Sequence, residues 1–354
     1  MPIEANPALE RRGLRLATGV SGSFALAILI SWPLATIFTV FTVLFLQAPG
    51  PMPPIAIRAL FRQAVVFLVA SWVFSTALAP YPVAFLMALA LAVATCFYWS
   101  TKGAGMLSVV LALMAALMLP TLVLTSQDLA LVLVIWIPIN LVLAWLWTVA
   151  MFHFFPPTPQ GAAAAAKPDA PHYDPNRLVL RMSLVTIPFA IYFYLVGSGA
   201  LATLLFVAIL SQQLSVATAA GPIVAKNMMK ANFIGGLVAI ACYELTVIAP
   251  LMLTALLVFA AAAFLLSYWF ISDRPDASMG GTALTTTVIL FGGSSAPFGK
   301  DADVKMIDRL VQIGNALIFV LIAYIVVDAF FPLDPEKRQR RRRGLRGLLR
   351  RAKT

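Results

Sequence analysis

The chain divides at residues 156–176, which read PPTPQGAAAAAKPDAPHYDPN and separate two strongly apolar halves. Proline and alanine dominate this segment, and no long apolar run crosses it. The end of the second half resembles the end of the first, because an Asn is followed by Phe154-Phe155-Pro156 in one and by Phe330-Phe331-Pro332 in the other. We therefore interpret the segment as a linker between two copies of one unit.

Composition places the chain in the membrane. Its 354 residues are 61% hydrophobic and 11% charged, whereas soluble globular chains are about 25% charged. These features predict an all-α integral membrane protein. The sequence contains no P-loop, catalytic or metal-binding motif, and its two cysteines lie singly in apolar runs. We therefore expect no enzymatic activity, no metal site and no cofactor.

The apolar runs predict about twelve transmembrane helices, six in each half. Several are short for one helix, which suggests tilted or broken spans. The predicted spans are residues 15–32, 34–48, 59–79, 82–99, 104–124, 128–155, 177–197, 200–216, 227–247, 249–270, 279–295 and 306–331.

The positive charges predict the orientation. Ten of the 25 Lys and Arg lie in residues 337–354, a tail without acids. Such a tail is typical of a cytoplasmic end that binds anionic lipids, and no aromatic residues interleave it as in a nucleic-acid-binding segment. Both termini and the linker are then cytoplasmic. The predicted domains are residues 1–155 and 177–332 as membrane repeats, 156–176 as linker and 333–354 as polybasic tail.

The two halves also match in register. Leu14-Arg15 corresponds to Leu180-Arg181, and Tyr98-Trp99 corresponds to Tyr268-Trp269. Because each half has an even number of predicted spans, both copies insert in the same direction. The sequence therefore predicts two parallel six-helix repeats, as in one class of transporters.

Two basic pairs are candidates for a substrate path. Arg58 and Arg62 begin the third span, and Lys226 and Lys230 begin the ninth. Residues four apart lie on one helix face. The pairs either anchor the helices at the cytoplasmic surface or attract an anionic substrate from the cytoplasm.

Polar side chains inside the apolar runs form a second group of candidates. Amides can hydrogen-bond across helices or line a substrate path. Thr286 lies between two Gly-Gly pairs, which permit either close packing or a helix break. The candidates are Gln47, Gln213, Asn140, Asn315 and Thr286.

Two acids are candidates for coupling transport to protons. Glu244 lies in the ninth span and Asp328 lies near the inner end of the twelfth. A carboxylate within a membrane protein can take up and release a proton. Each can equally be a satisfied structural acid or an acid at the interface.

The pattern of each half resembles a known family. A helix preceded by an arginine is followed by a helix that ends near a Gly-Pro turn, at Ala48–Pro54 and again at Ala219–Pro222. A third helix then begins with the basic pair. This arrangement is similar to the fusaric acid resistance protein-like (FUSC) or aromatic acid exporter superfamily, in a short form without large soluble domains.

The resemblance implies an efflux permease for small organic acids, aromatic or amphipathic, or for drugs. It also implies proton coupling and a periplasmic adaptor of the HlyD type in a bacterial inner membrane. A passive channel for organic anions and a non-transporting scaffold subunit are the alternatives. Both are compatible with the composition, as is a homo-oligomer.

Overall fold

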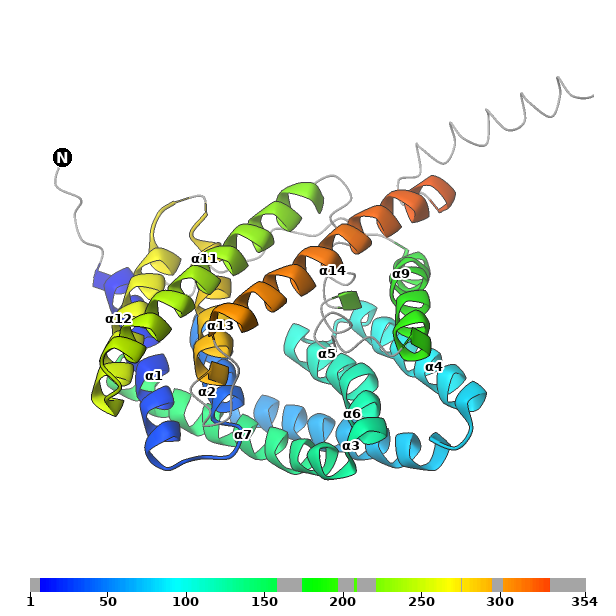
Figure 1. Cartoon of the computed structure of the whole chain (residues 1–354), viewed down its shortest axis with the longest axis horizontal. Coiled ribbons are helices and arrows are strands. Elements are labelled where there is room, and N and C mark those ends of the chain that lie inside the picture. The colour runs from blue at the N-terminus through cyan, green and yellow to red at the C-terminus, as the bar shows by residue number, and fades with distance from the viewer. Residues whose placement is uncertain are drawn as a thin grey trace, which may run out of the picture. The chain divides into compact units, whose positions relative to one another are not determined.

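The computed structural model describes residues 7–157, 174–196, 207–208, 221–274, 276–294 and 302–331. Within these residues every regular element is a helix. The helices are α1 (Pro7–Leu29), α2 (Ala35–Gln47), α3 (Pro54–Leu78), α4 (Pro82–Thr101), α5 (Met106–Leu113), the π-helix η1 (Met114–Met118), α6 (Leu119–Thr125), α7 (Gln127–Phe154), α9 (Pro175–Val196), α11 (Gly221–Ile248), α12 (Met252–Ile271), α13 (Ser278–Ser294) and α14 (Ala302–Phe330) (Figure 1).

Seven helices in the described residues are long and apolar enough to cross a membrane, which makes the chain a multi-pass membrane protein by length and composition. Four further predicted spans also correspond to helices, since α1, α2, α13 and α14 have 23, 13, 17 and 29 residues but are not among these seven. The predicted span at residues 200–216 lies almost wholly outside the described residues, so the total of twelve stays a prediction. The seven are Pro54–Leu78, Pro82–Thr101, Met106–Thr125, Gln127–Phe154, Pro175–Leu195, Lys226–Ile248 and Met252–Ile271.

The chain forms two compact units, each assembled from separate stretches of sequence. The first unit comprises Met1–Val69, Asp128–Ala170 and Lys226–Gln312. The second comprises Ala70–Gln127, Pro171–Ala225 and Ile313–Thr354. Each unit therefore draws residues from both sides of the linker.

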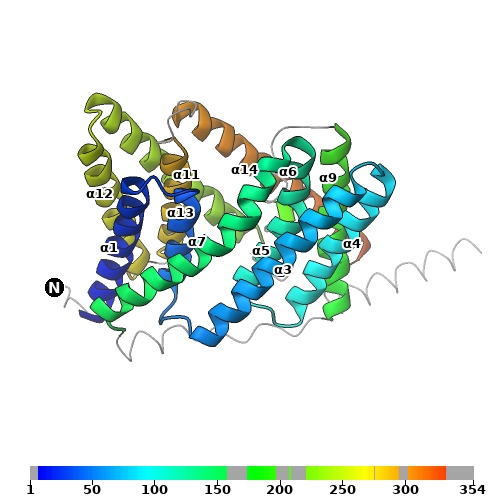
Figure 2. The same cartoon turned by 90° about the horizontal axis from the view of Figure 1, so that it is seen from below.

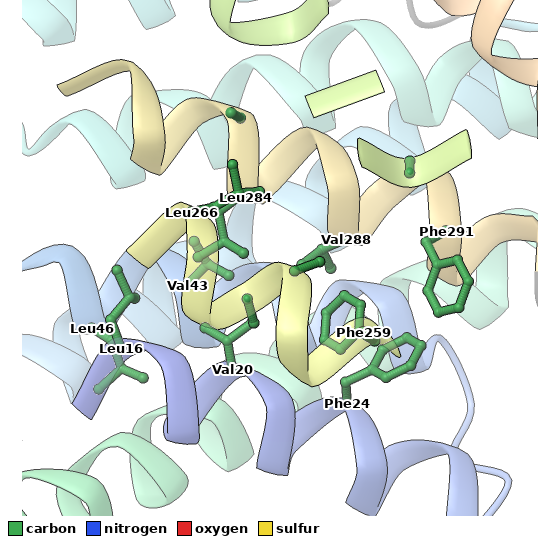
Figure 3. Close-up of a cluster of buried hydrophobic side chains, with 14 of the residues drawn as sticks. Leu16, Val20, Phe24, Val43, Leu46, Phe259, Leu266, Leu284, Val288 and Phe291 are labelled. Atoms are coloured by element: carbon green, nitrogen blue, oxygen red, sulfur yellow. The ribbon is translucent and has the colours of Figure 1, made fainter. Parts of the chain in front are cut away.

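The core of the first unit lies where α1, α2, α12 and α13 meet. Leu16, Val20 and Phe24 recur every four residues on α1 and so face the same way. The Phe24 ring lies 4.0 Å from that of Phe259 on α12, and Phe259 stacks on Phe291 of α13 at 5.7 Å. Figure 3 shows these rings together with the aliphatic side chains of the cluster. These helices therefore share one apolar core.

The second unit has a core of its own between α4, α5, η1 and α9. Leu89, Val93 and Phe97 form the buried stripe of α4. Against them pack Met182 and Phe193 of α9. Figure 2 shows α4 and α9 side by side.

Proline and glycine set several helix boundaries. Helices α3, α4 and α9 begin at Pro54, Pro82 and Pro175, because proline lacks the N–H that the first helical turn leaves unused. The turn between α4 and α5 contains Gly103 at a φ of 86°, a conformation that side chains disfavour. Proline and glycine between the apolar runs therefore mark where one helix ends and the next begins.

A π-helix interrupts the segment between α5 and α6. The Leu119 N–H donates to the Met114 carbonyl, five residues back. The next residue is Pro120, which has no N–H, so the carbonyl of Ala115 has no backbone donor at the π spacing. The hydroxyl of Ser71 on α3 donates to that carbonyl at 2.5 Å. A side chain from a neighbouring helix therefore replaces the donor that proline removes.

Candidate functional site

Two arginines are buried among the described residues. They are Arg15 on α1 and Arg181 on α9, and these residues are 2% and 1% exposed. A buried guanidinium is costly unless hydrogen bonds and opposite charge compensate it. In membrane proteins such residues often mark a functional site. The partners of the two arginines therefore carry the most information about function.

Arg181 is held by the end of α14. Its Nη1 donates to Asp328 Oδ1 at 2.5 Å and to the Phe331 carbonyl at 2.8 Å. Its guanidinium carbon lies 5.6 Å from the centre of the Tyr324 ring, within the range of a cation–π contact. The Asp328 side chain is 35% exposed. In this ion pair the arginine side chain is buried, whereas the aspartate side chain is partly accessible to solvent.

Arg15 is held by the end of α7. Its Nη1 donates to the Phe155 carbonyl at 3.2 Å, and its guanidinium carbon lies 4.0 Å from the centre of the Phe152 ring. One turn earlier, Nη2 of Arg12 donates to the Gln47 carbonyl at 2.9 Å. The two arginines therefore bring two positive charges into one packed region of the first unit.

The two sites share one contact and differ in another. Arg15 and Arg181 each donate to the second phenylalanine of a Phe-Phe-Pro sequence, at Phe155 and Phe331. Three residues before that phenylalanine, Arg181 meets the carboxylate of Asp328, whereas Arg15 meets the ring of Phe152. One guanidinium is paired with an acid of the chain, and the other is covered by an aromatic ring.

The predicted basic pairs lie on α3 and α11, and whether they anchor these helices or attract a substrate stays a prediction. Arg58 and Arg62 on α3 are exposed, as are Lys226 and Lys230 on α11. No ion pair joins any of the four to an acid among the described residues. Their spacing puts each pair on one helix face.

The predicted amides have unlike surroundings. Asn140 is fully buried, accepts a hydrogen bond from Trp32 Nε1 at 2.9 Å and donates to the Pro33 carbonyl at 3.3 Å. It therefore ties α7 to the connection between α1 and α2. Gln47 Nε2 donates to the Gly281 carbonyl of α13 at 3.1 Å. Asn315 is exposed, and Gln213 lies outside the described residues.

The predicted threonine region packs tightly against α11. Thr286 donates to Asn232 Oδ1 at 2.7 Å, and the hydroxyl of Thr287 lies 2.9 Å from the Gly235 carbonyl. A Cβ added to Gly235 would lie 2.4 Å from the carbonyl oxygen of Ala283. The first glycine pair before Thr286 is also closely packed, since a Cβ added to Gly280 would lie 2.6 Å from the backbone N of Phe270, and α13 runs unbroken from Ser278 to Ser294.

The two predicted acids also differ. Glu244 is exposed on α11, whereas Asp328 belongs to the buried ion pair with Arg181. Sequence reasoning used Arg15 and Arg181 as markers of register and did not predict their burial. The sequence did contain a signal for these contacts. Each half begins with one of the two matched arginines and ends with a Phe-Phe-Pro sequence.

An apolar pocket of about 370 Å³ opens in the first unit. It lies between α1, α2 and α7, and the indoles of Trp32 and Trp147 contribute to its wall. Both indole N–H groups are engaged, with Asn140 Oδ1 and the Gly19 carbonyl. The described residues contain no cluster of His, Cys, Asp or Glu that could hold a metal ion.

Comparison with known proteins returns one match. The model of a family described as "Protein of unknown function (DUF2955)" matches residues 12–154. The matched segment begins at Arg12 in α1 and ends at the last residue of α7. No curated protein and no solved structure matches the chain.

Proposed function

We propose that this protein is a membrane permease, built from two parallel six-helix repeats, that exports small organic acids. The observation that carries the proposal is the ion pair of Arg181 and Asp328. A buried cation whose acid partner is still accessible can exchange that partner for the carboxylate of a substrate. The aromatic or amphipathic class of acid, the inner membrane, the proton coupling and the periplasmic adaptor come from the resemblance to aromatic acid exporters.

Paired contacts support the repeat. Helix α1 packs against α12 in the first unit, and α9 packs against α4 in the second. In the proposed repeat α1 is equivalent to α9 and α4 to α12, so the two contacts are copies of each other. Each copy joins helices from different halves. The family match supports the same unit, because it ends where the first half ends.

The proposed coupling uses the accessible acid. Protonation of Asp328 removes its negative charge and weakens its hold on Arg181. The guanidinium is then available to an organic carboxylate, and loss of the proton reverses the exchange. The exposed charges of Arg58, Arg62, Lys226 and Lys230 raise the local concentration of anions at the surface of the protein.

The exchange is tested by Asp328→Asn, measured as efflux of radiolabelled benzoate from loaded cells with and without a protonophore. We expect efflux by the wild type to fall when the protonophore is added, and efflux by the variant to be insensitive to it. Asp174→Asn is the control, because Asp174 belongs to an exposed ion pair with Arg177 at 3.2 Å. It should behave as the wild type.

Glu244→Gln in the same assay shows which of the two predicted acids couples efflux to protons. Glu244 is exposed, whereas Asp328 is ion-paired with Arg181. Unchanged efflux and an unchanged protonophore response in both variants would contradict coupling through these acids. Benzoate flux that ignores the protonophore already in the wild type would indicate a passive channel. No benzoate flux, together with unchanged sensitivity of cells to organic acids, would favour a scaffold.

A further inference from the structure

We propose that Arg12 and Arg15 form a binding site for the carboxylate of a small organic acid. The site lies in the first unit, where α1 meets the ends of α2, α7 and α12. The proposal deepens the proposed function, on which it rests for the organic nature of the ligand. The residues and the carboxylate follow from the contacts below.

Two positive charges meet here, and no described acid forms an ion pair with either of them. The ion pairs within the described part of the chain join Arg177 to Asp174 and Arg181 to Asp328, and neither involves Arg12 or Arg15. The Nε atoms of both Arg12 and Arg15 are buried and have no hydrogen-bond partner within the part of the chain that the structure describes. An uncompensated buried guanidinium is costly, so the site favours any anion that can reach it.

The neighbours of the two arginines orient them without neutralising them. Backbone carbonyls of Gln47 and Phe155 each accept one hydrogen bond. The Phe270 ring lies 5.0 Å from the Arg12 guanidinium carbon, and the Phe152 ring lies 4.0 Å from that of Arg15. Rings at these distances contribute a cation–π attraction but no full negative charge. They also provide apolar surface for the body of an organic ligand.

The second unit indicates which anion fits. There the corresponding arginine, Arg181, makes the same contact to a phenylalanine carbonyl and in addition holds the carboxylate of Asp328 at 2.5 Å. In the first unit Phe152 occupies the position of that acid. Of the two buried arginines among the described residues, Arg181 therefore has a carboxylate of the chain as its partner and Arg15 has none, and a carboxylate supplied by a ligand would fill that place.

Access is through Arg12. Its side chain is partly exposed, whereas Arg15 is 2% exposed. An anion would therefore meet Arg12 first and Arg15 at the closed end of the site. Arg11, the neighbouring residue, is exposed and serves as a matched control.

The test measures binding of benzoate to the full-length protein in nanodiscs of zwitterionic lipid by isothermal titration calorimetry. We expect saturable binding of benzoate, no binding of its uncharged analogue benzamide, and much weaker binding of inorganic phosphate. Arg12→Gln and Arg15→Gln should each weaken benzoate binding by about tenfold or more, because each removes a charge-assisted hydrogen bond. Arg11→Gln should leave it unchanged.

Phe152→Asp is the decisive variant, because it keeps both arginines and copies the second unit. The new carboxylate should pair with Arg15 and abolish benzoate binding while the protein elutes as the wild type in size-exclusion chromatography. Phe152→Leu removes the ring without adding charge and should bind benzoate within about threefold of the wild type. If Phe152→Asp does not fold, the Arg12→Gln titration decides.

The proposal is overturned if the wild type does not bind benzoate, if folded Phe152→Asp binds it as well as the wild type does, or if phosphate or benzamide binds equally well. Anionic lipid in the nanodisc distinguishes a phosphate headgroup from a free carboxylate, since a headgroup site would show competition by lipid and no preference for benzoate over phosphate. Transport without benzoate binding at this site would refute the site alone. Binding without transport would refute the proposed export and leave the site standing.

Discussion

Replacing Gly235 with alanine should separate α11 from α13 in the first unit. The new Cβ would lie 2.4 Å from the Ala283 carbonyl oxygen, whereas ordinary contact begins at 3.4 Å. The helices must therefore part by about 1 Å, and because the obstacle is backbone, no side chain can turn aside. A shift of that size lengthens the contact from Thr287 to the Gly235 carbonyl from 2.9 Å to beyond hydrogen-bond range.

The expected cost follows from three contributions. Overpacking costs about 1–3 kcal/mol. The weakened hydrogen bonds of Thr287 to Gly235 and of Thr286 to Asn232 cost about 0.6 kcal/mol each in a membrane protein. The better helix propensity of alanine returns up to about 1 kcal/mol. The free energy of unfolding should therefore fall by about 1–3 kcal/mol.

Equilibrium unfolding in mixed micelles, followed by circular dichroism, measures this free energy. Gly314→Ala is the control, because a Cβ at Gly314 in α14 meets nothing within 4 Å. It should leave the free energy of unfolding unchanged or raise it slightly. If Gly235→Ala is no less stable than Gly314→Ala, the close approach of α11 to α13 is wrong.

Three further predictions concern hydrogen bonds between helices. Asn140→Ala removes the hydrogen bonds with the half-buried Trp32 indole and with the Pro33 carbonyl, and should lower the free energy of unfolding by about 1–3 kcal/mol with a shift in tryptophan fluorescence; an unshifted spectrum would contradict the contact. Tyr194→Phe removes the hydroxyl that donates to a π-helix carbonyl at 3.0 Å and should cost about 0.5–1.5 kcal/mol in the same assay; no loss would mean that the bond is not formed. Pro120→Ala restores the missing backbone N–H. Ser71→Ala should therefore lower the free energy of unfolding less in the Pro120→Ala protein than in the wild type. Additive effects in this double-mutant cycle would refute the proposed replacement of the donor.

Much of the helical structure was predictable from hydrophobicity. Eleven of the predicted spans overlap helical segments, because long apolar runs satisfy their backbone hydrogen bonds internally. The π-helix was not predicted, since it depends on Pro120 together with a hydroxyl from another helix. The composition of the two units was not predicted either. It depends on which helices pair across the linker, and similar apolar faces offer many partners of nearly equal hydrophobicity.

The candidate site was less accessible to sequence reasoning. Asn140 and Thr286 were among its candidates, and the hydrogen bonds observed for both join helices, whereas a role of either residue in a substrate path stays a prediction. The burial of Arg15 and Arg181 depends on contacts with Phe155 and Phe331, which lie 140 and 150 residues away. A sequence shows where a charge lies along a helix but not which other helix covers it.

The most direct test of the proposed export is transport by the purified protein in liposomes. Radiolabelled benzoate is trapped inside, a pH gradient is imposed, and the loss of label is compared with the leak from protein-free liposomes. The proposed exporter should release benzoate faster than the leak, in proportion to the gradient, and Asp328→Asn should remove the dependence on the gradient. Release no faster than the leak, across a panel of organic carboxylates, would contradict it.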